Sequence, residues 1–228
     1  MKYYDYDWGS IMRLVQPLPE YFQLARQLYQ TGPAHDFSHI ERVFRLALKI
    51  GAAENANLQI LGLAALFHDL ARDEEAASQG MICHAAASAE RTRRILLSRG
   101  MNPAVVEAVC DCIATHRYRD EHKPETLEAK CLFDADKLDS LGAVGVARAY
   151  LWLGERGGTV YVPRQVWERT DFRSNRPEDD SLQREWFIKL QYLKDNLYTE
   201  TARALAEKRH RTMEAFLEIL AREVVGEE

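Results

Sequence analysis

Apolar residues recur every three or four positions along most of the chain, separated by short polar breaks, which is the pattern of amphipathic helices. Ser38 and Glu41 form a capping box, and the helix behind it is predicted to start at His39. Asn102 and Pro103 supply an N-cap and a first-turn proline for another helix. The same spacing predicts helices over residues 58–72, 83–99, 103–116, 127–138, 141–153, 185–196 and 199–225. We therefore expect an all-α fold.

The chain is expected to form one domain, a helical bundle over residues 1–228. With 228 residues, of which 46% are apolar and 29% charged, it can bury one full core. Helical periodicity is lost over roughly residues 155–181, where glycines, prolines and mixed charges predict a long irregular segment. We expect the helices after this segment to pack back on the core. Residues 159–162 are the one short β-like run.

The charge pattern argues against some classes of partner. The formal net charge is −5 and no basic block stands out, so no nucleic-acid polymer is expected. No run reaches the roughly 18 apolar residues of a membrane span, and the first residues are polar and aromatic, so we expect a cytoplasmic protein without a membrane anchor. The four cysteines form no CxxC pair and are expected to be small buried residues.

His68 and Asp69 stand side by side inside the almost wholly apolar run of residues 58–72. A buried carboxylate needs a compensating partner, because an unpaired charge in the core is unfavourable. A bound cation would be such a partner. A hydrogen bond between this histidine and this aspartate is the structural alternative.

Two further clusters carry polar chemistry. His35, Asp36 and His39 lie around a predicted helix N-terminus, where backbone N–H groups favour anions, so they predict a metal ligand beside a phosphate-binding pocket. A capping aspartate with two surface histidines is the alternative. Residues 133–140 place three carboxylates and a lysine among apolar neighbours, which favours a cation site over a solvated turn. Two imidazoles and two carboxylates are a ligand set that leaves positions open for water and substrate.

These clusters together resemble the HD-domain metal-dependent phosphohydrolase superfamily, and in particular its small bacterial single-domain hydrolases. The order His39, then His68 with Asp69, then Asp136 matches the H…HD…D signature of that superfamily. A lone HD dipeptide is weak evidence, whereas the ordered set is strong. The similarity extends over residues 34–43, 65–72, 135–148, 201–203 and 206–209.

The resemblance implies an all-α bundle around one divalent metal held by four ligands: His39, His68, Asp69 and Asp136. Asp136 is preferred over Asp134 and Asp139 because it occupies the aspartate of the A-D-K-L-D pattern. The superfamily uses manganese, magnesium, cobalt, nickel or iron, and the histidine-rich set would also accept zinc.

Catalytic and substrate-binding residues are expected around the metal. Asp73 is our candidate general base or water positioner. Some related hydrolases carry a glutamate at the position of Arg72, so the identity of the general base stays open. Arg72 itself is better suited to bind a phosphate or to hold a carboxylate. His116 is the candidate acid. Residues expected to contact the substrate are His35, His84, Arg117, Lys137 and Lys189.

The predicted function is hydrolysis of a small phosphorylated molecule, most plausibly a nucleotide, as a pyrophosphohydrolase or a phosphomonoesterase. Two alternatives stay open. One is a metal-holding sensor domain that binds a nucleotide without turnover. The other is an HD-type di-iron oxygenase, which would require His84 and His116 as additional metal ligands. A homodimer is also left open.

Overall fold

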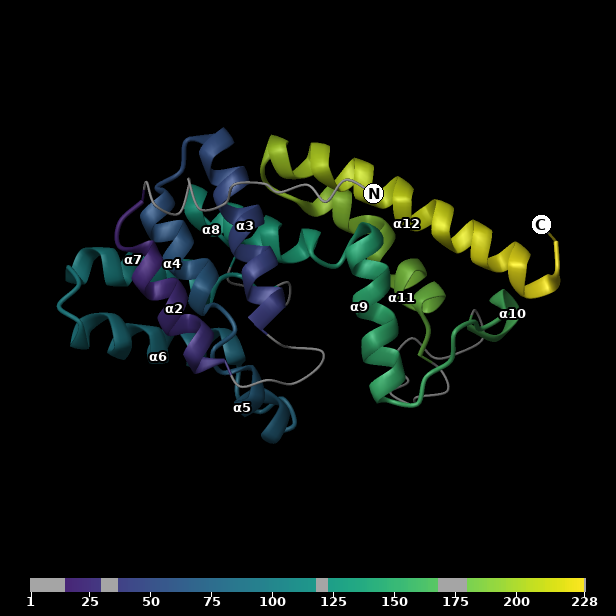
Figure 1. Cartoon of the computed structure of the whole chain (residues 1–228), viewed down its shortest axis with the longest axis horizontal. Coiled ribbons are helices and arrows are strands. Elements are labelled where there is room, and N and C mark those ends of the chain that lie inside the picture. The colour runs from purple at the N-terminus through teal and green to yellow at the C-terminus, as the bar shows by residue number, and fades with distance from the viewer. Residues whose placement is uncertain (1–14, 30–36, 118–122, 168–179, 228) are drawn as a thin grey trace. The chain divides into compact units, whose positions relative to one another are not determined.

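The computed structural model describes residues 15–29, 37–117, 123–167 and 180–227. Within these ranges the chain is all helical and contains no strand, which confirms the predicted all-α class (Figure 1). The elements are α2 (Leu18–Leu28), α3 (Phe37–Glu54), α4 (Leu58–Phe67), α5 (Arg72–Ala77), α6 (His84–Ser98), α7 (Pro103–Ala114), α8 (Leu127–Leu138), α9 (Gly142–Glu155), α10 (Arg164–Trp167), α11 (Leu182–Ile188), the 3-10 helix η2 (Leu190–Asn196) and α12 (Glu200–Val225).

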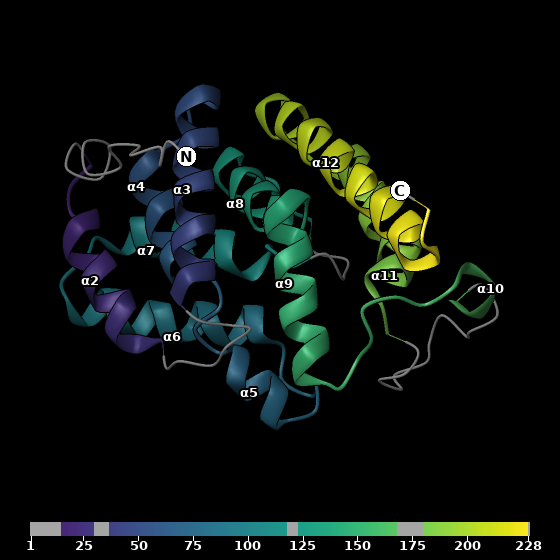
Figure 2. The ribbon, with the colours of Figure 1, turned by 45° about the vertical axis from the view of Figure 1, so that its right-hand side comes forward.

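The chain divides into two compact units, residues 1–136 and 137–228. The expectation of a single domain therefore stays a prediction. In the first unit α4 lies at the centre and packs against α2, α3 and α7, while α6 packs against α7 (Figure 2). Every residue of α4 from Leu61 to Phe67 is buried. A helix that is apolar on all faces is stable only when other helices surround it, so α4 is the core of this unit.

The predicted cap of α3 is wrong, whereas two other predicted helix features of this unit are confirmed. Helix α3 begins at Phe37, so Ser38 lies inside the helix, where its hydroxyl accepts a hydrogen bond from Arg42 at 2.9 Å, and it is not the N-cap. Helix α7 does begin as predicted, because the Asn102 side chain accepts a hydrogen bond from the Ala104 N–H at 2.9 Å. Helix α8 has the predicted bounds.

The apolar run at residues 58–72 is not one helix, as its pattern predicted. Helix α4 ends at Phe67 with His68 as its C-cap, and α5 begins only at Arg72. Between them the chain makes a tight turn, in which Leu70 N–H donates to Phe67 O at 3.4 Å and Arg72 N–H to Asp69 O at 3.1 Å. Asp69 therefore lies in a turn, which frees its side chain from the helical direction that would carry it about 100° away from His68.

In the second unit α12 packs against α9 and η2, and α11 packs against η2. The helix predicted over residues 185–196 is instead α11 followed by η2. The predicted irregular segment contains the short helix α10, and its residues 168–179 lie outside the described part. Residues 159–162 form no strand.

Three of the four cysteines are buried as predicted, whereas Cys83 is only half-buried. Among the described helices none is long and apolar enough to cross a membrane.

Candidate metal centre and its surroundings

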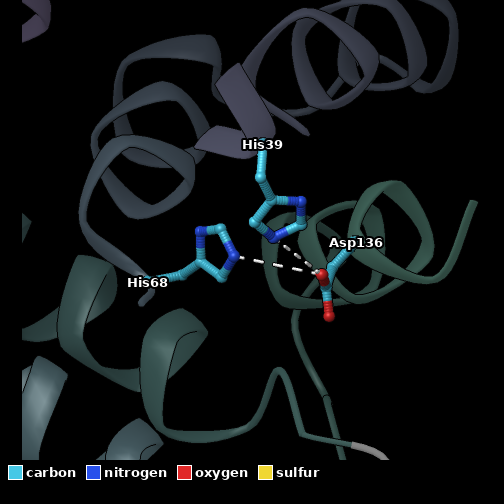
Figure 3. Close-up of side chains that lie close together, drawn as sticks. All are labelled: His39, His68 and Asp136. Atoms are coloured by element: carbon cyan, nitrogen blue, oxygen red, sulfur yellow. Dashed lines mark ion pairs between the residues drawn. The ribbon is translucent and has the colours of Figure 1, made fainter. Parts of the chain in front are cut away.

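Four side chains from separate parts of the first unit converge on one point. His39 comes from the first turn of α3, His68 from the C-cap of α4, Asp69 from the turn that follows, and Asp136 from the last turn of α8. Figure 3 shows His39, His68 and Asp136 pointing toward one another from three helices. The fold thus brings together the four residues expected to be metal ligands.

The distances within this cluster fit donor atoms around one ion better than hydrogen bonds. The His39 Nε2 atom lies 3.5 Å from Asp136 Oδ1 and 3.8 Å from Asp69 Oδ2. The corresponding distances from His68 Nε2 are 3.9 Å and 3.8 Å. Hydrogen bonds are shorter than about 3.2 Å, whereas two ligands that are each about 2.1 Å from one metal lie roughly 3 to 4 Å apart.

His68 shows which atom would bind the ion. Its Nδ1–H donates to the Ala65 carbonyl at 2.9 Å, so Nε2 carries a lone pair. That Nε2 atom is buried and has no hydrogen-bond partner among the described residues. Burial lowers the pKa of His68 to about 4, which keeps the imidazole neutral, as metal binding requires. A buried lone pair aimed at two carboxylates is unfavourable without a cation, so the residues present fit a divalent metal.

The other oxygen of Asp69 faces two more histidines. Asp69 Oδ1 lies 3.3 Å from His84 Nε2 and 3.6 Å from His116 Nε2, and these two nitrogens are 3.2 Å apart. The Nδ1–H of His116 donates to the Ile113 carbonyl at 2.6 Å, and that of His84 donates to Glu75 at 2.8 Å. Three acceptors thus meet, with Arg72 Nη1 as a nearby donor 3.3 Å from His84 Nε2, and a shared proton or a second cation would stabilise them further.

The charge of Asp69 is well stabilised. Burial alone would raise the pKa of its carboxyl, but the neighbouring basic groups His68, His116 and Arg72 hold that pKa well below its ordinary value. Asp69 therefore remains a carboxylate and can face both groups of histidines.

A cavity of about 200 Å³ opens beside Asp69 and His39. Both Arg72 and Asp73, predicted to act in catalysis, line it, and Asp73 is exposed. The Tyr29 hydroxyl in its wall is buried, and its O–H has no acceptor among the described residues. The lining residues are Leu28, Tyr29, His39, Ile40, Asp69, Leu70, Arg72, Asp73 and Arg91.

Sequence reasoning missed three residues here: Tyr29, Glu75 and Arg91. Arg91 donates to the Leu70 carbonyl at 2.7 Å, which fixes two lining residues of the cavity relative to each other. On its exposed side Arg91 also donates to Glu74 at 2.9 Å. Tyr29 precedes the first predicted helix, and Glu75 is one of two adjacent glutamates on a short helix, so neither carried a distinguishing pattern.

The remaining predicted residues are spread over several places. Arg117 pairs with Glu75 at 2.6 Å, on the side of the histidine pair. Lys137 follows Asp136 on α8. Lys189 belongs to the second unit, where it pairs with Glu185 at 3.1 Å. His35 lies outside the described residues. The substrate-binding roles of these residues stay predictions.

The three nearby aspartates have different surroundings, and the role of Asp136 as a ligand stays a prediction. Asp139 pairs instead with Arg148 at 2.9 Å, and its side chain is almost completely buried there. Asp136 is the one of the three whose carboxylate lies within 4 Å of His39 and His68 in the described ion pairs.

Comparisons with known proteins give the same picture. The family model for the HD domain matches residues 36–141, which include all four proposed ligands. YpgQ of Bacillus subtilis (strain 168) is 34% identical over 203 residues, which cover 87% of this chain and 89% of YpgQ.

Solved structures extend this similarity over most of the chain. The crystal structure of Bacillus subtilis YpgQ in complex with ADP matches with a TM-score of 0.69 and 30% identity, covering 92% of this chain and 98% of that one. A predicted HD superfamily hydrolase from an uncultured Thermotogales bacterium matches with a TM-score of 0.67 and 28% identity, covering 96% and 99% of the two chains. On this evidence, the chain belongs to the HD-domain family.

Proposed function

We propose that this protein is a divalent-metal-dependent phosphohydrolase that acts on a nucleotide. The observation that carries the proposal is the buried Nε2 of His68, which has no hydrogen-bond partner in the described part of the chain and faces the carboxylates of Asp69 and Asp136 beside His39. The metal is proposed to be one ion of manganese, magnesium, cobalt, nickel, iron or zinc. A hydrolase is supported by the HD-superfamily hydrolases of similar structure, and a nucleotide by the ADP complex of YpgQ.

Hydrolysis needs a water to attack phosphorus, the bond to the leaving oxygen to break, and a proton to reach that oxygen. When bound, a divalent ion lowers the pKa of a water and neutralises phosphoryl charge. Asp73, exposed in the cavity wall, would accept the proton of the attacking water. His116 would act in its doubly protonated form, in which Nδ1–H stays on the Ile113 carbonyl while the proton on Nε2 passes to the leaving oxygen.

Binding of the phosphate groups is proposed to use the basic residues around the cavity. Arg72 lines the cavity and is only partly buried, so its guanidinium can reach a phosphate oxygen. Arg117 and His84 would contact the substrate on the far side of Asp69. Lys137, Lys189 and His35 complete the proposed set.

The acceptor cluster of Asp69, His84 and His116 is the observation that favours a second candidate function, the di-iron oxygenase. If it binds a second metal, the two-metal arrangement that the di-iron oxygenase alternative requires becomes available. One metal per chain favours the hydrolase as proposed. Two irons per chain and activity that is lost without oxygen would favour the oxygenase.

The proposal is tested by metal analysis and product release on the same sample. Wild type purified with manganese or cobalt should contain about one ion per chain and release phosphate or pyrophosphate from a panel of nucleotides and phosphoesters. The variant Asp69→Ala should lose both metal and activity, whereas Asp73→Asn should keep its metal and lose roughly 100-fold in kcat. A metal-loaded wild type that releases neither product from any substrate would instead be a sensor domain.

A further inference from the structure

Glu75 on α5 lies at the centre of a polar network beside Asp69. Its Oε2 accepts the hydrogen bond from His84 Nδ1 at 2.8 Å, and its Oε1 lies 2.6 Å from Arg117 Nη2. Arg72 Nη1 is 3.6 Å from the same carboxylate. One side chain thus contacts three residues proposed to act on the substrate.

The hydrogen bond to Glu75 decides the state of the His84 ring. A carboxylate only accepts hydrogen bonds, so Nδ1 of His84 must carry a hydrogen. The ring is then held with Nε2 toward Asp69 Oδ1, 3.3 Å away, and toward His116 Nε2. Without this acceptor the ring would be free to change its tautomer or to turn its Nε2 away from Asp69.

The surroundings keep Glu75 ionised. Its side chain is 13% exposed, and burial alone would raise the pKa of its carboxyl. The hydrogen bond from His84, together with the charges of Arg117 and Arg72, lowers that pKa below its ordinary value. A carboxylate is therefore present at neutral pH to orient both groups.

The neighbouring Glu74 shows what an ordinary surface glutamate looks like on the same helix. Its side chain is 46% exposed and pairs with Arg91 at 2.9 Å. An exposed ion pair of this kind contributes little to stability. Glu74 touches none of the histidines in the described contacts, so it provides a matched control for Glu75.

We propose that Glu75 is a positioning residue, whose carboxylate orients His84 toward Asp69 and anchors Arg117 for substrate binding. Its effect on the substrate rests on the proposed function, whereas its effect on the His84 ring does not. Carboxylate–histidine pairs of this kind fix ring orientation in other sites, and their loss typically lowers affinity or activity about 10- to 100-fold.

The first test reads the ring directly by nitrogen-15 NMR of histidine-labelled protein, with the His84 signal assigned by its loss in His84→Gln. In wild type the hydrogen should be on Nδ1. It should shift toward Nε2 in Glu75→Ala and stay on Nδ1 in Glu74→Ala. A wild-type His84 with its hydrogen on Nε2 alone, or a tautomer unchanged in Glu75→Ala, would overturn the proposal.

The second test measures binding of ADP with manganese by calorimetry, and KM against kcat where turnover is seen. Glu75→Ala should weaken ADP binding and raise KM about tenfold with metal content unchanged, and Glu74→Ala should match wild type. Glu75→Gln keeps a hydrogen-bond acceptor but no charge, so it should retain the His84 tautomer and lose part of the affinity for ADP. This variant is also the folded alternative if Glu75→Ala does not fold. If wild type binds ADP but hydrolyses no member of the nucleotide and phosphoester panel, the proposed function fails, while the ring and binding results still decide the role of Glu75. ADP binding unchanged in Glu75→Ala would contradict it.

Discussion

The ring nitrogens of three histidines determine what the polar centre can do. In His68, His84 and His116 the Nδ1–H is held by an acceptor outside the cluster, so each Nε2 is directed at Asp69. Asp69 meets His68 with one oxygen and the other two histidines with the second oxygen. One carboxylate thereby joins the proposed metal to the proposed acid and substrate contacts.

Tyr29 offers a test of the cavity as a substrate site. Its buried oxygen faces the backbone N–H of Asp69, whereas its O–H has no acceptor among the described residues, and such a donor gains free energy when a ligand supplies an acceptor. Tyr29→Phe should weaken ADP binding roughly 3- to 10-fold, measured by calorimetry in the presence of manganese. Tyr21→Phe on α2, the helix that Tyr29 follows as C-cap, is the control, because Tyr21 is absent from the cavity lining and its ring packs on Phe67. Equal ADP affinity in Tyr29→Phe and wild type would show that the cavity wall does not contact the nucleotide.

At the level of single residues, sequence reasoning could find the residues that the ordered signature marks. The proposed ligands are 97 positions apart at their extremes, yet His39, His68, Asp69 and Asp136 do meet. Glu75 and Tyr29 could not be found in this way, because their importance depends on contacts that only the folded turn and helices create.

Helices α7 and α8 were predictable from apolar periodicity, and in α7 the Asn102 cap also marked the start. The run at residues 58–72 failed because its residues are apolar on every face, so periodicity could not show where α4 ends. The helix ends at His68 and Asp69. A continuous helix would point these two side chains about 100° apart, away from one proposed ion. A local departure from the expected element therefore coincides with the proposed site, as is common at functional residues.

Helix α9 provides a matched pair of glycines for testing the packing of the second unit. A Cβ at Gly145 would lie 2.2 Å from the Ser140 carbonyl oxygen, a backbone atom that cannot move aside easily, whereas a Cβ at Gly154 meets nothing within 4 Å. Gly145→Ala should lower the free energy of unfolding by about 1 to 3 kcal/mol, and Gly154→Ala should raise it by about 0.5 to 1 kcal/mol. Urea unfolding of the two variants checks both signs, and a destabilisation of equal size at both positions would contradict the packing of α9.

For the whole molecule, the neutral state of His68 predicts how stability depends on pH without metal. The pKa of His68 is lowered to about 4 in the folded protein, from an ordinary value of 6.5. Between these values the unfolded chain binds a proton that the folded chain does not, so stability is lost as the pH falls. In EDTA, this group should make the free energy of unfolding about 2 kcal/mol lower at pH 5 than at pH 7.5.

The control for this pH effect is His68→Asn, which removes the titrating ring. Urea unfolding at the two pH values should show a smaller difference for the variant than for wild type. A pH dependence that is the same in both proteins would mean that His68 is protonated in the folded state.

The four-ligand site is proposed to support hydrolysis of a nucleotide. Phosphorus-31 NMR follows every phosphorus atom of a nucleoside triphosphate and its products after incubation with the manganese-loaded protein, once the paramagnetic manganese has been removed on a chelating resin. With wild type the substrate signals should disappear and free phosphate or pyrophosphate should appear, but not with Asp69→Ala or after EDTA treatment. Unchanged substrate signals for this nucleotide and for the rest of the panel, from a sample shown to hold its metal during the incubation, would contradict hydrolysis at this site.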